Sequence, residues 1–469
     1  MTFFRKKDSS DMGKMLFTNK DIMKITIPIL IQQILNFTVG MINTMMVSNA
    51  GEAAVSGVSL ANMLDGVLII FFTALVAGGT VVVAQVLGTK GRDVGDVVKQ
   101  LIYATTIVAI VVTTVVLIFQ DGILSLLFNG AEADVIESTY AYFSIVALSF
   151  PLLAINESIF GCFNSAGNSV ISLITSFLIN IMVVIGNLIF VIGLDMGATG
   201  AAIATLCARF GGSVILLILI HRKKYSVHVE HLLHYKPNFR VIKNILHIGV
   251  PNGIENTLFQ FGRLMTQSLI AMLGTTVIAA NAVALNIVQF QYSVNTAFAV
   301  VVIPIVGRCI GAKKIDQAKY YSRKMLGLEY IMLAGVVVLT LLFTEPLMAT
   351  YNLSEEGTKL AIQLIIFHSV VAAVIYPFGF LLPSVFRAAA DVRFTLVVSM
   401  VSMWALRVAL AYVLALETVS VFGLFSFSGF GLGIWGVWFA MIGDWLLRAL
   451  LYAIRYLTGK WLKVRQLIH

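Results

Sequence analysis

Long apolar segments recur along the whole chain and are separated by short polar stretches. A segment of about 20 mostly apolar residues is long enough to cross the hydrocarbon layer of a membrane as a helix. Hydrophobic residues make up 59% of the chain and charged residues 12%, which is more apolar surface than one soluble core can bury. We therefore predict an all-α polytopic membrane protein with about twelve transmembrane helices.

The predicted spans form two sets that are separated by a basic linker. The first set covers 21 to 47, 55 to 86, 98 to 120, 137 to 160, 168 to 192 and 198 to 221. The second covers 243 to 272, 279 to 310, 324 to 344, 358 to 385, 393 to 416 and 433 to 457. We expect an N-terminal lobe at 21 to 221, a linker at 222 to 242, a C-terminal lobe at 243 to 458, and tails at 1 to 20 and 459 to 469.

The distribution of charge predicts the orientation. Loops after even-numbered spans carry basic residues such as Lys90 and Lys313, whereas loops after odd-numbered spans are acidic or neutral, as at Asp121 and Glu345. By the positive-inside rule, both tails are predicted to be cytoplasmic, in the plasma (inner) membrane. The first twenty residues are polar and basic without a small-residue cleavage site, so we expect no signal peptide. The formal charge of +9 then reflects topology, and we expect no nucleic-acid partner.

Motifs for other classes of function are missing from the sequence. Cys162, Cys207 and Cys309 are scattered through apolar runs, so no disulfide framework or metal cluster follows from them. There is no HExxH motif, no GxSxG motif within a span and no nucleotide-binding P-loop. We therefore predict that the chain is not an enzyme, is not driven by ATP and needs no cofactor.

The chain also repeats itself. At a shift of 223 residues, Pro28 falls on Pro251, and further matches follow without gaps to the fourth span. The matched pairs are Gln32 with Glu255, Gly51 with Gly274, Gln85 with Arg308, Gly88 with Gly311, and Phe163 with Phe386. Each repeat holds an even number of spans, so the two have the same orientation and are related by an axis along the membrane normal, an arrangement known from transporters. Duplicated helix packing alone is the alternative, because close helix approach also favours small residues.

Several motifs resemble the multidrug and toxic compound extrusion (MATE) family over nearly all of residues 20 to 462. They are Pro28 with Gln32, AQVLGTKGRD, VGRCIGAKKID, FNSAGNS, FRAAADVRF, GATGAAIAT, GIWGVW and TGKW. The resemblance implies a V-shaped pair of six-helix bundles that exports organic cations or other amphiphiles in exchange for sodium or protons.

The sequence departs from this family in its N-terminal half. Asn43 stands where the family usually has an acidic residue, and Asn180 is followed four residues later by Val184 rather than by aspartate. The usual acidic cation site of that half is therefore missing. Arg308 stands where the family prefers glutamine, and we expect it to anchor at the cytoplasmic membrane edge.

Ionisable side chains at membrane depth are costly and commonly mark a transport pathway. Glu255, one turn after Pro251, is our first candidate, because the family's C-terminal lobe similarly uses a seventh-span glutamate for coupling. It is predicted to exchange a proton or to bind sodium, with no other metal expected. The alternative is a static ion pair with Arg263 or Arg407.

In the N-terminal half, Glu157 is the candidate replacement for the missing carboxylates, and the alternative is that it pairs with Arg209. Asp65 is a further candidate for a cavity. Asp444 and Arg448 have the spacing of a local helical pair, and we interpret them as structural.

Polar side chains in the eighth and tenth predicted spans complete the candidate site. His368 titrates near neutral pH and could relay protons to Tyr376 or Glu255, although a lone histidine in a helix is more often a packing residue. Asn286 and Gln289 either line a wet cavity or bond neighbouring helices, as does Asn281.

The linker contains three histidines in the stretch HVEHLLH, namely His228, His231 and His234. Their spacing could supply metal ligands. We favour an amphipathic helix on an anionic membrane surface, because the stretch is basic.

Together these features predict a monomeric secondary active exporter that works by alternating access in antiport with H⁺ or Na⁺. Its substrate is predicted to be a small amphiphile, with organic cations favoured by the buried carboxylates. An anionic or lipid-linked substrate is the alternative, because Arg209, Arg263 and Arg407 also lie within predicted spans. A membrane-embedded enzyme or a receptor is a weaker alternative.

Overall fold

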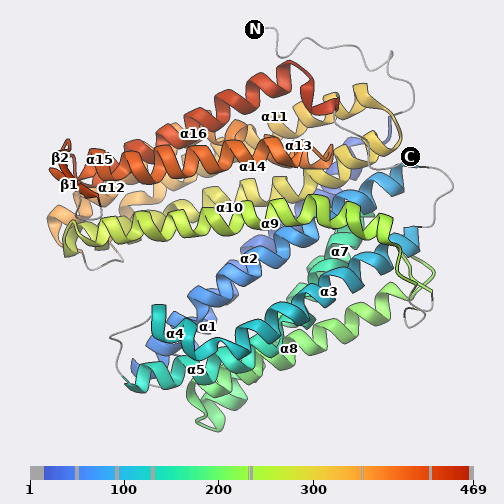
Figure 1. Ribbon diagram of the computed structural model, residues 1–469, viewed down its shortest axis with the longest axis horizontal. Helices are drawn as coiled ribbons and strands as arrows, with labels where there is room; N and C mark the ends of the chain where they lie inside the picture. The colour runs from blue at the N-terminus through green and yellow to red at the C-terminus, as the bar shows by residue number, and fades with distance from the viewer. Residues whose placement is uncertain are drawn as a thin grey trace. The chain divides into compact units, whose positions relative to one another are not determined.

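The computed structural model describes residues 15–47, 52–89, 94–127, 133–230, 232, 236–349, 351, 353–421 and 425–463. Long helices account for most of these residues (Figure 1). Helices suit a chain this apolar, because a helix satisfies its own backbone hydrogen bonds where no water is present.

The N-terminal half consists of helices only, within the described residues. They are α1 (Asn19–Val47), α2 (Glu52–Gly88), α3 (Val94–Ile118), α4 (Gln120–Leu127), α5 (Ala133–Leu148), α6 (Phe150–Ser165), α7 (Ser169–Asn187), the π-helix η3 (Leu188–Gly193) and α8 (Gly197–Ile220).

The C-terminal half repeats this pattern and adds one hairpin. Its elements are α9 (Phe239–Ala271), α10 (Thr275–Gly311), α11 (Ile315–Met348), α12 (Glu355–Phe380), α13 (Leu382–Ala388), α14 (Val392–Val401), the π-helix η4 (Ser402–Ala409), α15 (Leu410–Ala415), β1 (Thr418–Val421), β2 (Phe425–Ser428), α16 (Ile434–Leu457) and the 3₁₀-helix η5 (Lys460–Leu462). The strands pair antiparallel, with Thr418 opposite Ser428. This hairpin occupies the insertion that lengthens the second repeat.

Ten helical segments of the described chain are long and apolar enough to cross a membrane. An eleventh is the pair α5 and α6, which is bent by 48° next to Pro151. The remaining predicted span is α9, which is 33 residues long but carries polar side chains along its length, among them Glu255 and Arg263. The predicted twelve-helix fold class is confirmed once α9 is included.

The chain divides into two compact units, and the boundaries after Gly253 and after Val306 fall inside α9 and α10. The first unit contains the described residues up to Gly253 together with Gly307–Lys313, and the second contains Ile254–Val306 and the described residues from Lys314 onward. The first part of α9 and the last part of α10 therefore pack with the N-terminal helices. The lobe boundaries predicted from the sequence remain predictions.

Each unit has its own apolar core. In the first unit, α2, α5 and α6 bury Phe72, Phe143 and Phe150. In the second, α12 and α16 bury Leu364 and Trp445 among other large side chains.

Very close helix contacts in the first unit involve the glycines of the repeat. A Cβ atom on Gly311 of α10 would overlap the carbonyl oxygen of Gln85 in α2, and a Cβ on Gly88 would overlap the carbonyl oxygen of Arg308. The backbones of α2 and α10 can approach this closely only because these positions have no side chain. Arg308 also donates a hydrogen bond from Nη2 to the carbonyl oxygen of Ser165 at 2.5 Å.

The linker is not the amphipathic helix that the sequence predicted, at least over its described residues. Residues 221 to 230 and 236 to 238 form turns and irregular segments that fold back on the first unit. Gln100 and Tyr103 of α3 donate hydrogen bonds to the carbonyl oxygens of Lys236 and Leu232, at 2.7 and 2.8 Å. These contacts, which a pattern of charge and hydrophobicity cannot reveal, replace the internal hydrogen bonds of a helix.

Candidate functional site

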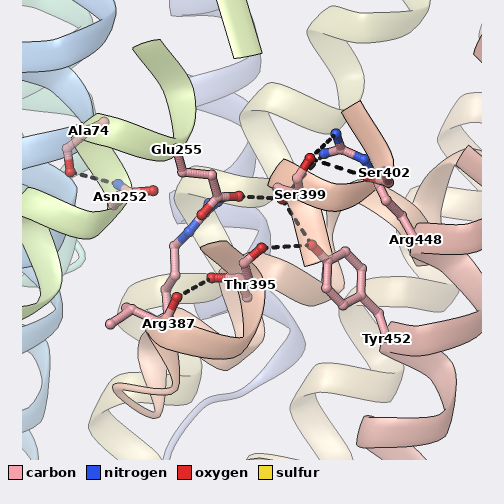
Figure 2. Close-up of polar contacts among 10 residues, drawn as sticks. Ala74, Asn252, Glu255, Arg387, Thr395, Ser399, Ser402, Arg448 and Tyr452 are labelled. Atoms are coloured by element: carbon pink, nitrogen blue, oxygen red, sulfur yellow. Dashed lines mark hydrogen bonds and ion pairs between the residues drawn. The ribbon is translucent and has the colours of Figure 1, made fainter. Parts of the chain in front are cut away.

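Glu255 is buried in α9, one turn after Pro251, and its two carboxylate oxygens have different contacts (Figure 2). Oε1 accepts a hydrogen bond from Ser399 Oγ at 2.6 Å and forms an ion pair with Arg387 Nη2 at 3.0 Å. Oε2 is buried and has no hydrogen-bond partner among the described residues. The carboxylate is therefore neutralised on one side and retains an unused acceptor on the other.

The sequence analysis did not identify Arg387 as the partner of Glu255. The alternatives it considered, Arg263 and Arg407, do not pair with Glu255, because the short helix α13 brings Arg387 to it instead. At the repeat shift of 223 residues, Arg387 corresponds to Asn164, and Glu255 to Gln32. The ion pair is thus specific to the second repeat. Aligning the two repeats would have shown that both positions are charged only there.

Ser399 of α14 connects Glu255 to a second group of charges. Its Oγ lies 3.0 Å from Tyr452 Oη and accepts a hydrogen bond from Arg448 Nη1 at 3.3 Å (Figure 2). Arg448 Nε lies 2.6 Å from Asp444 Oδ1, so the predicted helical pair forms. A continuous line of polar contacts therefore runs from α9 through α14 to α16.

Arg407 and Arg263 are less completely paired. Arg407 approaches Asp444 Oδ2 at 3.7 Å, and its buried Nε has no hydrogen-bond partner among the described residues. Arg263 is exposed, and among the described residues its hydrogen-bond partner is Gln260 Oε1, at 3.4 Å. The positive charges of these two guanidinium groups are therefore only partly neutralised by neighbouring carboxylates.

His368 lies within an aromatic cluster of α10, α12 and α16. Its Nε2 is 2.7 Å from Tyr292 Oη, and the Tyr292 ring lies 5.3 Å from the ring of Tyr376. The His368 ring also packs edge-on against Trp438 and Trp445. Nδ1 of His368 is buried without a partner among the described residues. Tyr292, rather than Tyr376 or Glu255, is thus the hydrogen-bond partner of His368.

The amides of α10 divide into two groups. Asn281 accepts a hydrogen bond from Trp438 Nε1 at 3.1 Å, so it connects α10 to α16. Asn286 is exposed and Gln289 is half-buried. Of these three amides, Asn286 and Gln289 therefore remain candidates for lining a water-filled cavity.

Glu329 of α11 is a buried carboxylate that the sequence analysis overlooked. Its side chain is fully buried, Oε1 accepts a hydrogen bond from Asn295 Nδ2 at 2.6 Å, and Oε2 has no partner in the described part of the chain. The signal was visible, because Glu329 lies inside the predicted span 324 to 344.

In the N-terminal half, Arg209 pairs with Asp65 rather than with Glu157. Arg209 Nη2 lies 3.3 Å from Asp65 Oδ2, and Nη1 donates to Ser149 Oγ at 2.6 Å. Glu157 is half-buried on α6 and makes no hydrogen bond or ion pair with any described residue. Asp65 is therefore paired with an arginine through Oδ2, while its Oδ1 is buried without a hydrogen-bond partner among the described residues, and Glu157 has no direct cationic partner there.

Amides connect α1 and α7, at Asn36, Asn43, Asn180 and Asn187. Asn187 donates to Asn43 Oδ1 at 2.5 Å, and Asn180 donates to Asn36 Oδ1 at 3.1 Å. Gln32 is half-buried on α1. These neutral contacts hold two helices together and offer no proton-binding group.

The linker histidines do not form a metal site in the described residues. His228 Nδ1 lies 3.0 Å from the carbonyl oxygen of Tyr225, and His231 and His234 lie outside the described residues. Lys223 Nζ donates a hydrogen bond to Glu230 Oε1 at 2.7 Å, and this bond together with the negative charge of Glu230 raises the pKa of Lys223. Across the described chain, no group of three or more His, Cys, Asp or Glu side chains could hold a metal ion.

Comparison with known proteins agrees with this architecture. The model of the MatE family matches residues 28–189 and 251–413, one match in each repeat. The probable multidrug resistance protein NorM of Thermotoga maritima is 24% identical over 457 residues, covering 95% of this chain and 93% of that protein. The uncharacterized transporter YisQ of Bacillus subtilis is also 24% identical, covering 94% and 95%.

Solved structures share the fold. An outward-facing multidrug resistance MATE family transporter of the MOP superfamily superposes with a TM-score of 0.84 at 17% identity, covering 95% of this chain and 97% of that one. A MOP superfamily transporter from Pyrococcus furiosus, described as having a binding pocket of reversed polarity, superposes with a TM-score of 0.81 at 18% identity, with the same coverage. The duplicated helical units, the matching family model and these relatives together place the chain in the MATE family of membrane transporters, and it is not an enzyme.

Proposed function

We propose that this protein is a secondary active exporter that moves small amphiphilic molecules out of the cell by alternating access, in antiport with protons. Membership of the MATE family supports the transport class. The observation that carries the coupling mechanism is Glu255, a buried carboxylate with one oxygen paired to Arg387 and the other unused. A carboxylate at membrane depth with a free acceptor can bind and release a proton.

The surroundings of Glu255 favour a proton over sodium as the coupling ion. Arg387 lies 3.0 Å from Oε1, and Arg448 donates to the same serine hydroxyl that bonds Glu255. A sodium ion on Oε2 would bring a second cation to a carboxylate that already pairs with Arg387, and the two positive charges would repel each other. A proton on Oε2 removes the negative charge of Glu255 without adding another positive centre beside the arginines.

Protonation of Glu255 would change the balance of contacts around it. The ionised carboxylate holds Arg387 of α13 and Ser399 of α14 against α9. Once neutral, Glu255 loses its electrostatic attraction for Arg387, so the contact between α9 and α13 weakens. A conformational equilibrium can then shift by as much as protonation favours one state over the other.

Glu157 has a secondary role in the proposed proton coupling. It lies on α6, within electrostatic range of Arg209 but without a direct ion pair to it. We propose Glu157 as a second protonation site, whereas Asp65 joins α2 to α8 through its ion pair with Arg209.

The remaining features of the proposal concern topology. We propose that both tails and the linker at 222 to 242 are cytoplasmic, that the lobes span 21 to 221 and 243 to 458, and that the protein works as a monomer in the plasma (inner) membrane surrounded by lipid. The support is the basic character of loops after even-numbered spans.

The charge of the substrate is a separate question. Asp65, Glu255 and Asp444 are all paired with arginines. Little unpaired negative charge therefore remains to bind the organic cations that the sequence predicted as substrates.

The test is transport by the full chain reconstituted in liposomes. Export of a fluorescent amphiphile is measured under an imposed proton gradient and, separately, under an imposed sodium gradient. We expect the proton gradient alone to drive export by the wild type and by Glu356→Gln, a control that removes an exposed carboxylate at the start of α12. Glu255→Gln should lose gradient-driven export. Export driven only by sodium, or unchanged in Glu255→Gln, would refute the proposed coupling.

A further inference from the structure

The second unit holds more positive than negative charge at membrane depth. We define the arginine cluster as Arg263, Arg387, Arg407 and Arg448, together with the carboxylates Glu255 and Asp444 that lie among them. Four guanidinium groups therefore share two carboxylates. Glu329 does not balance the excess, because its hydrogen-bond partner is Asn295 rather than an arginine.

The excess charge is concentrated at Arg407. Asp444 already makes a 2.6 Å contact with Arg448 through Oδ1, and Arg407 reaches the other oxygen only at 3.7 Å. The side chain of Arg407 is 12% exposed, and its Nε has no partner among the described residues. Arg263, a second cation, lies within electrostatic range of it. A guanidinium with an unused, buried donor beside another cation is unfavourable unless an anion approaches it.

The local backbone and the neighbouring rings give this position the features of a binding site. Arg407 lies on η4, a segment of π-helix, and such segments occur frequently at functional sites. The guanidinium carbon of Arg407 lies 5.7 Å from the centre of the Phe259 ring, and Tyr292 is within electrostatic range. A ligand that reached Arg407 would therefore meet both a fixed positive group and aromatic surfaces.

We propose that Arg407, assisted by the exposed Arg263, binds the anionic group of a transported amphiphile whose aromatic or apolar body packs against Phe259 and Tyr292. This inference rests on the proposed function as an exporter and specifies the charge of its substrate. The planar guanidinium suits a carboxylate, sulfonate or phosphate, because it can donate two parallel hydrogen bonds to their oxygens. Free organic anions and the headgroups of anionic lipids share this chemistry.

The coupling mechanism is consistent with an anionic substrate. Asp444 contacts both Arg407 and Arg448, and Arg448 contacts Ser399, which bonds Glu255. An anion on Arg407 would compete with Asp444 for that guanidinium. The substrate site and the proton site are therefore joined by named contacts within one unit.

The test compares two dyes that share a three-ring xanthene body and differ in charge. Fluorescein is anionic at slightly alkaline pH, and rhodamine 123 is cationic. Their binding to the purified full chain in an uncharged detergent is measured by fluorescence anisotropy, for the wild type, Arg407→Gln and Arg393→Gln. The last variant is the matched control, because Arg393 is an exposed arginine of α14 and its replacement removes the same charge.

We expect the wild type and Arg393→Gln to bind fluorescein more tightly than rhodamine 123, and Arg407→Gln to lose roughly tenfold or more of its affinity for fluorescein. Fluorescein binding should also weaken as salt is added. A preference of the wild type for rhodamine 123, or equal fluorescein affinity in Arg407→Gln and Arg393→Gln, would overturn the proposal.

Two further measurements keep the test decisive. If Arg407→Gln does not fold, Arg407→Lys and Arg263→Gln replace it. Each should weaken fluorescein binding relative to Arg393→Gln, and unchanged binding in both would refute the site.

Competition with phosphatidylglycerol and with benzoate distinguishes the two kinds of anionic ligand. Displacement of fluorescein by the lipid identifies an anionic headgroup, displacement by benzoate a soluble organic anion, and displacement by neither opposes the proposal.

These binding measurements do not depend on transport. Binding that requires Arg407 in a protein that exports nothing would leave the anion site standing and refute the proposed function. Proton-driven export with fluorescein binding that is insensitive to Arg407 would refute the anion site alone.

Discussion

Glu255 resembles Asp65 in the contacts of its two carboxylate oxygens, but Glu255 is also linked through Ser399 to a second arginine, Arg448. One oxygen has a strong cationic partner in Arg387, and the other has none among the described residues. At the repeat shift of 223 residues, Glu255, Arg387 and Ser399 correspond to Gln32, Asn164 and Ser176. The same duplicated framework thus holds a charged group in one half and a neutral group in the other. At these three matched positions, a proton can change the charge only in the second repeat, because the first repeat has Gln32 where the second has Glu255.

The ion pair between Glu255 and Arg387 makes a prediction about stability. Removing one partner of a buried pair leaves an uncompensated charge, so Arg387→Gln should destabilise the protein by about 3 kcal/mol. The double variant with Glu255→Gln should be less destabilised than the sum of the single variants. Thermal unfolding of the purified protein in detergent measures both effects.

The same variants should respond to pH. In Arg387→Gln, Glu255 can escape the penalty of a buried charge by taking up a proton. Its deficit relative to the wild type should therefore be smaller at about pH 5 than at about pH 8. Strictly additive effects of the two substitutions, or a deficit that grows on acidification, would show that the pair does not act as the structure indicates.

Sequence reasoning at the level of single residues found some partners and missed others. Glu255 stands out because it follows Pro251 within a predicted span. Arg387 was missed because it follows the predicted end of its span at residue 385. The choice of Asp65 over Glu157 as the partner of Arg209 depends on how α2 and α6 are rotated against α8, which apolar periodicity does not determine.

At the scale of elements, the apolar segments predicted nearly every long helix, because the period and length of such segments depend on local sequence. The exception to the hydropathy rule is α9, whose polar side chains are partly satisfied by its packing. Asn252, for example, donates from Nδ2 to the carbonyl oxygen of Ala74 in α2 at 2.6 Å (Figure 2). The helix predicted for the linker is wrong for the residues of it that the structure describes, because their conformation depends on hydrogen bonds to α3, which lies far away in sequence.

The glycine contact between α2 and α10 predicts the effect of adding one methyl group. Gly311→Ala would place its Cβ against the backbone oxygen of Gln85, so the helices would have to separate. We expect a loss of about 1–3 kcal/mol in stability, typical of overpacking. In Gly335→Ala, the matched control on α11, the new Cβ has no atom within 4 Å, and the substitution should be neutral or slightly stabilising.

Thermal unfolding of the two variants in the same detergent measures this difference in stability. Equal melting temperatures for Gly311→Ala and Gly335→Ala would mean that the close approach of α2 and α10 contributes little to stability.

At the scale of the whole molecule, the family model matches each repeat once, and the chain forms two compact units, the first of which also takes in parts of α9 and α10 from the second repeat. The sequence therefore predicted the fold class and the family. It did not predict the charge balance of the site, because that balance depends on which arginine contacts which carboxylate. Its expectation of cationic substrates came from counting carboxylates, whereas three of those carboxylates are paired.

The central claim is that Glu255 couples substrate movement to protons, and coupling between the two must be reciprocal. Liposomes containing the protein are loaded with whichever of fluorescein or rhodamine 123 it transports, with no ion gradient imposed, and the luminal pH is followed with an indicator read away from the dye. The account predicts that dye flowing out of the liposomes drives protons inward, so that the lumen acidifies with the wild type but not with Glu255→Gln. Dye efflux by the wild type without luminal acidification, or the same acidification with Glu255→Gln, would contradict it.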